Sequence, residues 1–165
     1  MNILWHRNDL RIHDNPAVAE TGRETAPLYI FDPDWLESEL VNDARIRFVI
    51  ESLKDLNRQY VDRGTHLAVL YGDTLEVLEE LSQDHDVFFT ADPDTLRQKL
   101  ESEARDRYRA VKPGFLRTAG RGDPESWEED TEEWIEADPI EPPESFSQNP
   151  VSGSVMLDEI EDKHD

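Results

Sequence analysis

Short apolar runs recur along the first two thirds of the chain, and each is followed by a polar turn and a segment of helical periodicity. Runs of four or five residues rich in branched and aromatic side chains are typical of buried strands. They occupy residues 2–5, 27–31, 67–71 and 87–90, and a shorter one lies at 109–111. We therefore expect five strands, separated by polar and helical segments.

The segments between these runs carry the signals of helix starts and amphipathic helices. Residues 42–63 have the clearest pattern, because apolar side chains recur there at steps of three and four and Gly64 follows as a helix-ending glycine. The apolar stripe consists of Ile46, Val49, Ile50, Leu53, Leu56 and Tyr60. Other helices are expected to begin after the capping residues Asn15, Asp32, Asp73 and Asp92. Strands that alternate with helices predict an α/β fold, a Rossmann-like doubly wound parallel five-stranded sheet with helices on both faces.

The composition changes after about Arg117. Residues 118–165 contain sixteen acidic and two basic residues, whereas the rest of the chain is more balanced. We expect residues 1–117 to form the α/β domain and 118–165 to form an acidic, connector-like tail. This tail is predicted to hold one short helix at about 124–137, with Trp127 and Trp134 on one face, and then an extended or disordered end rich in proline and serine.

The charge of the chain argues against several kinds of partner. Its formal net charge is −22, from 39 acidic and 17 basic residues, and such a surface repels nucleic-acid phosphates. We therefore expect no direct nucleic-acid binding, and scarce lysine with abundant acid is typical of proteins adapted to high salt.

No cysteine is present, so disulfides and thiolate chemistry are excluded. The sequence has no membrane-spanning run and no secretory signal, which favours a cytoplasmic protein.

The most specific stretch is 5–17, Trp-His-Arg-Asn-Asp-Leu-Arg-Ile-His-Asp-Asn-Pro-Ala, which predicts a strand end, a polar loop and a helix start. Its charged residues Arg7, Asp9 and Arg11 are expected to hold the loop by charge-assisted contacts and not to do chemistry. The stretch resembles the opening of the DNA photolyase/cryptochrome family, whose pattern is W-[FH]-R-R-D-L-R-x-x-D-N-x-A. Asn8 departs from this pattern.

The resemblance extends to about residue 100, through Phe31-Asp32-Pro33, the segment 44–53 and Gly72-Asp73. It implies the N-terminal α/β domain that carries the light-harvesting antenna in this family, most like the class with a deazaflavin antenna. Four chromophore-binding positions carry over by type, namely Asp32, Arg45, Asp92 and Asp94, although the following residues 95–97 depart from the family pattern. Asp32 and Asp92 fit two interpretations equally well, as helix caps alone or as caps that also bind the ligand.

The resemblance also implies what this sequence lacks. In the family, a large helical domain that binds FAD follows the α/β domain, and nothing after Arg117 resembles it. We therefore expect no FAD, no catalytic residue and no metal site on this chain, whose five histidines are scattered singly. The preferred hypothesis is a stand-alone domain that binds an antenna chromophore or docks to a separate FAD-bearing partner. The alternatives are a nucleotide-binding or signalling protein on the same scaffold, and a truncated or split photolyase.

Overall fold

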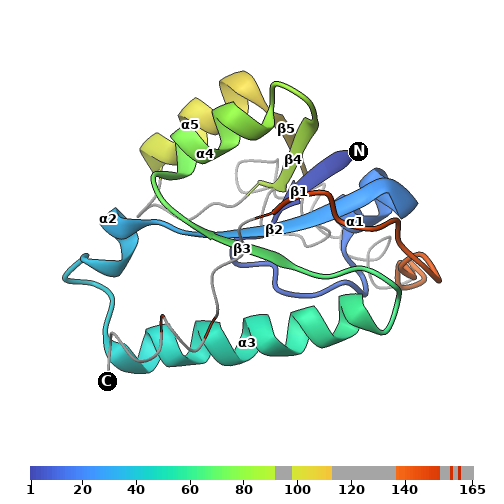
Figure 1. Ribbon diagram of the computed structural model, residues 1–165, viewed down its shortest axis with the longest axis horizontal. Coiled ribbons are helices and arrows are strands. Elements are labelled where there is room, and N and C mark those ends of the chain that lie inside the picture. Colours follow the sequence, from blue (N-terminus) through green and yellow to red (C-terminus); the bar gives the residue numbers. More distant parts are fainter. Residues whose placement is uncertain (92–97, 113–136, 153–156, 158–159, 161–165) are drawn as a thin grey trace, which may run out of the picture.

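The computed structural model describes residues 1–91, 98–112, 137–152, 157 and 160, and these contain a single five-stranded parallel sheet (Figure 1). The strand order is β3-β2-β1-β4-β5, and every neighbouring pair is parallel. The strands are β1 (Asn2–Trp5), β2 (Thr25–Phe31), β3 (Ala68–Tyr71), β4 (Asp86–Thr90) and β5 (Arg109–Val111). All five predicted strands are confirmed, and β2 begins two residues early because Thr25 and Ala26 pair with the start of β1.

Helices cover both faces of the sheet, as the alternating pattern predicts. Their bounds are α1 (Pro16–Thr21), α2 (Pro33–Leu36), α3 (Asp43–Val61), α4 (Thr74–Leu81) and α5 (Gln98–Arg107), with a 3₁₀ turn at Gly22–Glu24. Figure 1 shows α3 on one side of the sheet and α4 and α5 on the other. The chain winds outward from β1 in both directions, so the Rossmann-like doubly wound fold is confirmed.

Each face of the sheet has its own hydrophobic cluster, because successive strand side chains point to opposite sides. Leu4, Tyr29 and Phe31 pack with the predicted stripe of α3 on one face. Trp5, Leu28 and further strand residues pack with Leu78 and Ala104 of α4 and α5 on the other. The predicted stripe is confirmed for Ile46, Ile50, Leu53, Leu56 and Tyr60, which are all buried, and its sixth member, Val49, is partly buried against the same cluster.

The segment 137–152 corrects one expectation about the tail. It is extended, as its prolines predict, but it packs on the domain and is not a disordered linker. Phe146 is 6% exposed and its ring meets that of Tyr60, with the centroids 5.2 Å apart. The buried side chain of Asn149 donates to the Pro27 and His66 carbonyls, both at 2.9 Å. These contacts could not be predicted from the sequence, because single Phe and Asn residues among prolines and acidic residues show no hydrophobic periodicity.

Other parts of the predicted tail are described only at single positions or not at all. Ile160 is buried in the cluster on the α3 face, so a residue close to the chain end also contributes to the core. The expected helix at 124–137, with Trp127 and Trp134, and the proposed domain boundary at 117 fall outside the described residues, except for position 137.

Candidate functional site

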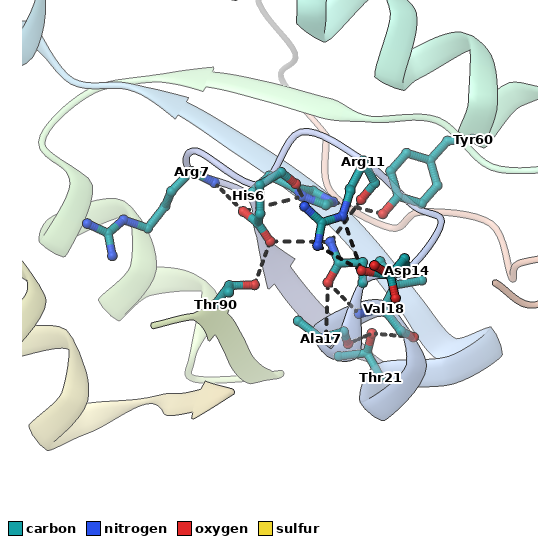
Figure 2. Close-up of polar contacts among 11 residues, drawn as sticks. His6, Arg7, Arg11, Asp14, Ala17, Val18, Thr21, Tyr60 and Thr90 are labelled. Carbon is teal, nitrogen blue, oxygen red and sulfur yellow. Dashed lines mark hydrogen bonds and ion pairs between the residues drawn. The ribbon is translucent and has the colours of Figure 1, made fainter. Parts of the chain in front are cut away.

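The loop after β1 is held by a hydrogen-bond network centred on Asp9, and Figure 2 shows these polar contacts in the region between the labelled residues Arg7, Thr90 and Arg11. One carboxylate oxygen of Asp9 accepts from the Arg7 backbone N–H at 3.1 Å. The other accepts from the Thr90 hydroxyl at the end of β4 and from the Asn15 amide at 3.3 Å. Asn15 in turn caps α1 by accepting from Ala17 N at 3.0 Å. Asp9 therefore joins two strand ends to a helix start, and Arg11 donates to the Asp14 carbonyl at 2.8 Å, which confirms the predicted structural role of these two residues. The prediction is wrong for the charged end of Arg7, which binds Glu101 of α5, so that only its backbone N–H contacts the loop.

Behind this loop, His6 and Tyr60 form a buried pair. The His6 Nε2 atom lies 2.8 Å from the Tyr60 hydroxyl, and Nδ1 lies 3.1 Å from the Asp9 carbonyl. Burial lowers the pKa of His6 below its ordinary value, against the smaller opposing effect of Asp9, and burial raises the pKa of Tyr60. Both groups are therefore neutral near pH 7, with Nδ1–H donating to Asp9 and Nε2 accepting from Tyr60. His6 is therefore buried with a hydrogen-bond partner on each ring nitrogen.

A pocket of about 340 Å³ lies where the carboxyl ends of β2 and β3 lead into their helices. Parallel doubly wound sheets place their ligands at this edge. The pocket draws its walls from α2 and the loop that follows it, from the first turns of α3 and α4, and from the first two turns of α5. Its lining residues are Asp32, Asp34, Trp35, Ser38, Leu40, Val41, Arg45, Asp73, Leu75, Lys99, Leu100 and Glu103.

The fold brings two of the four predicted ligand positions into this one pocket. Asp32 follows β2 and Arg45 lies in the first turn of α3, so thirteen sequence positions separate residues that share a cavity. Asp92 and Asp94 fall outside the described residues, as does the expected helix start there. The structure thus places half of the predicted set, and binding by any of them stays a prediction.

Asp32 is a cap for two helices. Its Oδ1 accepts from Asp34 N at 2.9 Å and so caps α2. Its Oδ2 accepts from Thr74 N at 3.0 Å and from the Thr74 hydroxyl at 2.6 Å, at the first residue of α4. A carboxylate offers about four acceptor positions, so three are already used. The cap role is thereby established, and room for one further donor remains.

Arg45 differs from Asp32 in how its polar groups are used. Its backbone N–H is capped by Asn42 Oδ1 at 2.9 Å, while the side chain is exposed at the pocket. Among the residues that the structure describes, no carboxylate pairs with its guanidinium. A planar cation with five donors is suited to bind ring or carboxylate oxygens of a ligand.

Sequence reasoning missed most of the remaining pocket residues. Trp35, Leu40, Val41, Leu75 and Leu100 supply apolar surface, and Lys99 and Glu103 supply charge from α5. Trp35 could have been found from its place two positions after the Asp32-Pro33 cap. No sequence signal marks the α5 residues, because they reach the pocket only through the packing of that helix. The arrangement is suited to a planar ligand with polar edges, which needs apolar contact and a few oriented donors and acceptors.

Metal ligation and membrane insertion find no support in the described part of the chain. No group of His, Asp and Glu there has the arrangement of a metal site. None of its helices combines the length and the apolar character needed to cross a bilayer.

The chain is similar to known proteins over most of its length. The DNA photolyase family model matches residues 2–118. The (6-4)DNA photolyase of Arabidopsis thaliana is 35% identical over 120 residues, which cover 64% of this chain and 22% of that protein. Cryptochrome-1 of Anopheles gambiae is 37% identical over 94 residues, covering 50% of this chain and 17% of its own length. The chain thus spans only about a fifth of these relatives.

Solved structures give the same fold. A bacterial class III photolyase from Agrobacterium tumefaciens superposes with a TM-score of 0.72 at 23% identity, over 96% of this chain and 37% of that one. An archaeal photolyase from Sulfolobus tokodaii gives 0.70 at 20% identity, over 97% and 41%. Together with the family match over residues 2–118, these likenesses lead to one conclusion: the chain belongs to the DNA photolyase family and has the fold of its N-terminal α/β domain.

Proposed function

We propose that this chain binds a planar light-harvesting chromophore of the deazaflavin class in the pocket at the ends of β2 and β3. The observation that carries the proposal is the guanidinium of Arg45, which has no carboxylate partner among the described residues and lies at the rim of a cavity with an aromatic and aliphatic wall. A cavity of about 340 Å³ is within the range of small-molecule sites, roughly 300–1,000 Å³.

The chemistry of the lining matches such a ligand. A deazaflavin has a flat ring system with carbonyl oxygens and a chain of hydroxyls. Trp35 and Leu100 offer apolar surface to the ring, and Arg45 offers donors to its oxygens. Asp34, Asp73 and Glu103 offer acceptors to the hydroxyls, so each part of the ligand has a complementary group in the pocket.

A second candidate function is docking to a separate FAD-bearing domain. It is favoured by Phe48 on α3, which is 71% exposed although it is a large apolar side chain, and by exposed Leu40 nearby in sequence. The chain spans about a fifth of its curated relatives, so any activity of the whole photolyase also remains a proposal. Under this hypothesis the domain is not catalytic by itself.

The chromophore proposal is tested by titrating the purified chain with an 8-hydroxydeazaflavin and following ligand fluorescence. Arg45→Ala should weaken binding by about 1.5–3 kcal/mol, the contribution of a charged hydrogen bond. The matched control is Arg58→Ala, which removes an arginine from the same helix outside the pocket, where it pairs with Asp55 at 2.8 Å. It should leave the affinity unchanged.

The outcomes separate the hypotheses. Equal binding by Arg45→Ala and wild type would exclude the proposed contact. No binding by wild type would make the pocket vestigial and leave docking as the better hypothesis. FAD serves as the second ligand, since the archaeal photolyase from Sulfolobus tokodaii has two FAD molecules, with the implication of a novel light-harvesting cofactor in that protein. If the wild-type chain binds FAD more tightly than the deazaflavin, the proposed class of chromophore is wrong, but the proposed binding site stands.

A further inference from the structure

Helix α5 faces the sheet with a charged residue. Among its side chains that the structure describes, only Glu101 and Ala104 are buried, and Glu101 is 7% exposed. Ala104 contributes a single methyl group, and Leu100 is half-buried. Helix α5 therefore packs on the sheet with few buried apolar side chains. The carboxylate of Glu101 on its buried face requires a partner, since burying an isolated charge costs much free energy.

That partner is Arg7, which lies in the loop after β1 and precedes Glu101 by 94 positions in the sequence. Its Nη1 donates to Glu101 Oε2, while Glu101 Oε1 accepts from Arg105 Nε at 3.0 Å. The guanidinium lies over the ring of Trp5, 5.0 Å from its centroid. Figure 2 shows the Arg7 side chain extending away from the His6–Tyr60 pair, so it takes no part in the loop network through its charged end.

The ion pair between Arg7 and Glu101 is poorly explained as a source of stability. Arg7 is 5% exposed, and its buried Nε and Nη2 atoms have no hydrogen-bond partner among the residues that the structure describes. Unsatisfied buried donors cost free energy, and buried ion pairs can often be replaced by apolar residues at no loss. The pair does constrain the position of α5 on the sheet, because Arg7 and Glu101 have good hydrogen-bond geometry in only one placement of this helix.

The placement of α5 matters for the pocket. Lys99, Leu100 and Glu103 surround Glu101 in sequence and form one wall, while α2 and the loop through Leu40 form another. We propose that the Arg7–Glu101 ion pair is a positioning device that sets the separation of these two walls. Only the identity of the ligand rests on the proposed function, since the separation of the walls can be measured without a ligand.

The test uses the absence of cysteine from the chain. Leu40→Cys and Lys99→Cys place one spin label on each wall, and electron paramagnetic resonance then gives the distribution of distances across the pocket. The pair is removed by the double substitution Arg7→Met and Glu101→Leu. The control removes the exposed pair on α3 by Arg58→Met and Asp55→Leu.

The double variant should keep the melting temperature of wild type but give a broader or shifted distance distribution. Amides of α5 should also exchange about tenfold faster or more, as in a locally loosened element. Arg7→Met alone should lower the melting temperature, because it leaves Glu101 buried without its main partner. The control pair should change neither readout.

A purely structural role predicts that melting temperature and wall separation change together. An unchanged distance distribution in the double variant would overturn the proposal. If wild type binds the deazaflavin, the double variant should also bind it about tenfold more weakly. If wild type binds none while the distribution still depends on the pair, the proposed function fails and the positioning role stands.

Discussion

Buried and partly buried polar residues in the loop after β1 account for the most specific part of the sequence. Asp9 satisfies donors from three segments, the loop itself, β4 and the start of α1. His6 contacts both the Tyr60 hydroxyl and the Asp9 carbonyl, so both of its ring nitrogens have polar partners inside the protein. Polar groups that are buried must be hydrogen-bonded, so their identity is more constrained than that of exposed residues. The motif is thus explained by structure without assigning it a catalytic role.

A pH-dependence of stability follows from the buried His6. Its pKa is lowered in the folded state, so below the ordinary value of 6.5 the unfolded chain binds a proton that the folded chain does not. The free energy of unfolding should therefore fall as pH drops below about 6.5, by at most about 1.4 kcal/mol per pH unit. Above about pH 6.5 the neutral His6 should cause no such loss of stability. Urea unfolding from about pH 7.5 to 5.5 measures this slope.

The comparison needs two variants. His6→Gln removes the titrating group and should flatten the slope, apart from a constant loss of stability. His13→Gln removes a histidine that is more than half exposed on the same loop, and should keep the slope of wild type. An identical slope in wild type and His6→Gln would show that other groups control the acid sensitivity.

At the level of the elements, helix starts are tied to strand ends by shared capping residues. Asp32 follows β2 and caps both α2 and α4, whereas Asp73 follows β3 and caps α4 through Glu76 N at 2.9 Å. These caps fix the first turns of α2 and α4, two of the helices that line the pocket. The geometry of the candidate site is therefore set by backbone hydrogen bonds as well as by packing.

Asp32→Ala should cost more stability than Asp73→Ala. The first removes acceptors from two helix starts and the second from one, so we expect losses of about 2 and 1 kcal/mol, with about 1 kcal/mol per cap. Denaturant unfolding of both variants beside wild type gives the difference. Equal losses would mean that the contact of Asp32 with Thr74 contributes nothing, and Thr74→Val would then be as stable as wild type.

For the whole molecule, the segment 137–152 is part of the folding unit. Backbone bonds from Phe146 N to Arg63 O and from Ser147 N to Arg23 O, both 2.8 Å, add to the buried contacts of Phe146 and Asn149. The segment connects the start of β2 with the turn before β3, where Gly64 has a φ of +89°. The conformational cost of ordering it is offset by these contacts.

Phe146→Ala should destabilise the whole domain by about 3–5 kcal/mol, the usual cost of removing a buried aromatic ring. Unfolding should remain a single transition when followed by circular dichroism and by tryptophan fluorescence. Phe48→Ala is the matched control, since this Phe is 71% exposed, and it should change stability by less than about 0.5 kcal/mol. A Phe146→Ala variant as stable as wild type would mean that the segment is dispensable.

The sequence alone determined the features that depend on neighbouring residues. Apolar runs located the strands, the stripe on 42–63 located α3, and Asn15, Asp32 and Asp73 marked helix starts, because caps and periodicity act within about four positions. The family pattern also identified Asp32 and Arg45, which share the pocket.

The tertiary structure decided the contacts between residues far apart in the chain. Arg7 meets Glu101 and Thr90 meets Asp9 across 94 and 81 positions, and Phe146 reaches Tyr60 from a segment without periodicity. The wall of the pocket formed by α5 could not be predicted from the sequence either, since Lys99 and Glu103 have the pattern of ordinary solvent-exposed charges on a helix. Such pairs form only after the sheet has brought its strand ends together, and their energies depend on burial, which no local pattern contains.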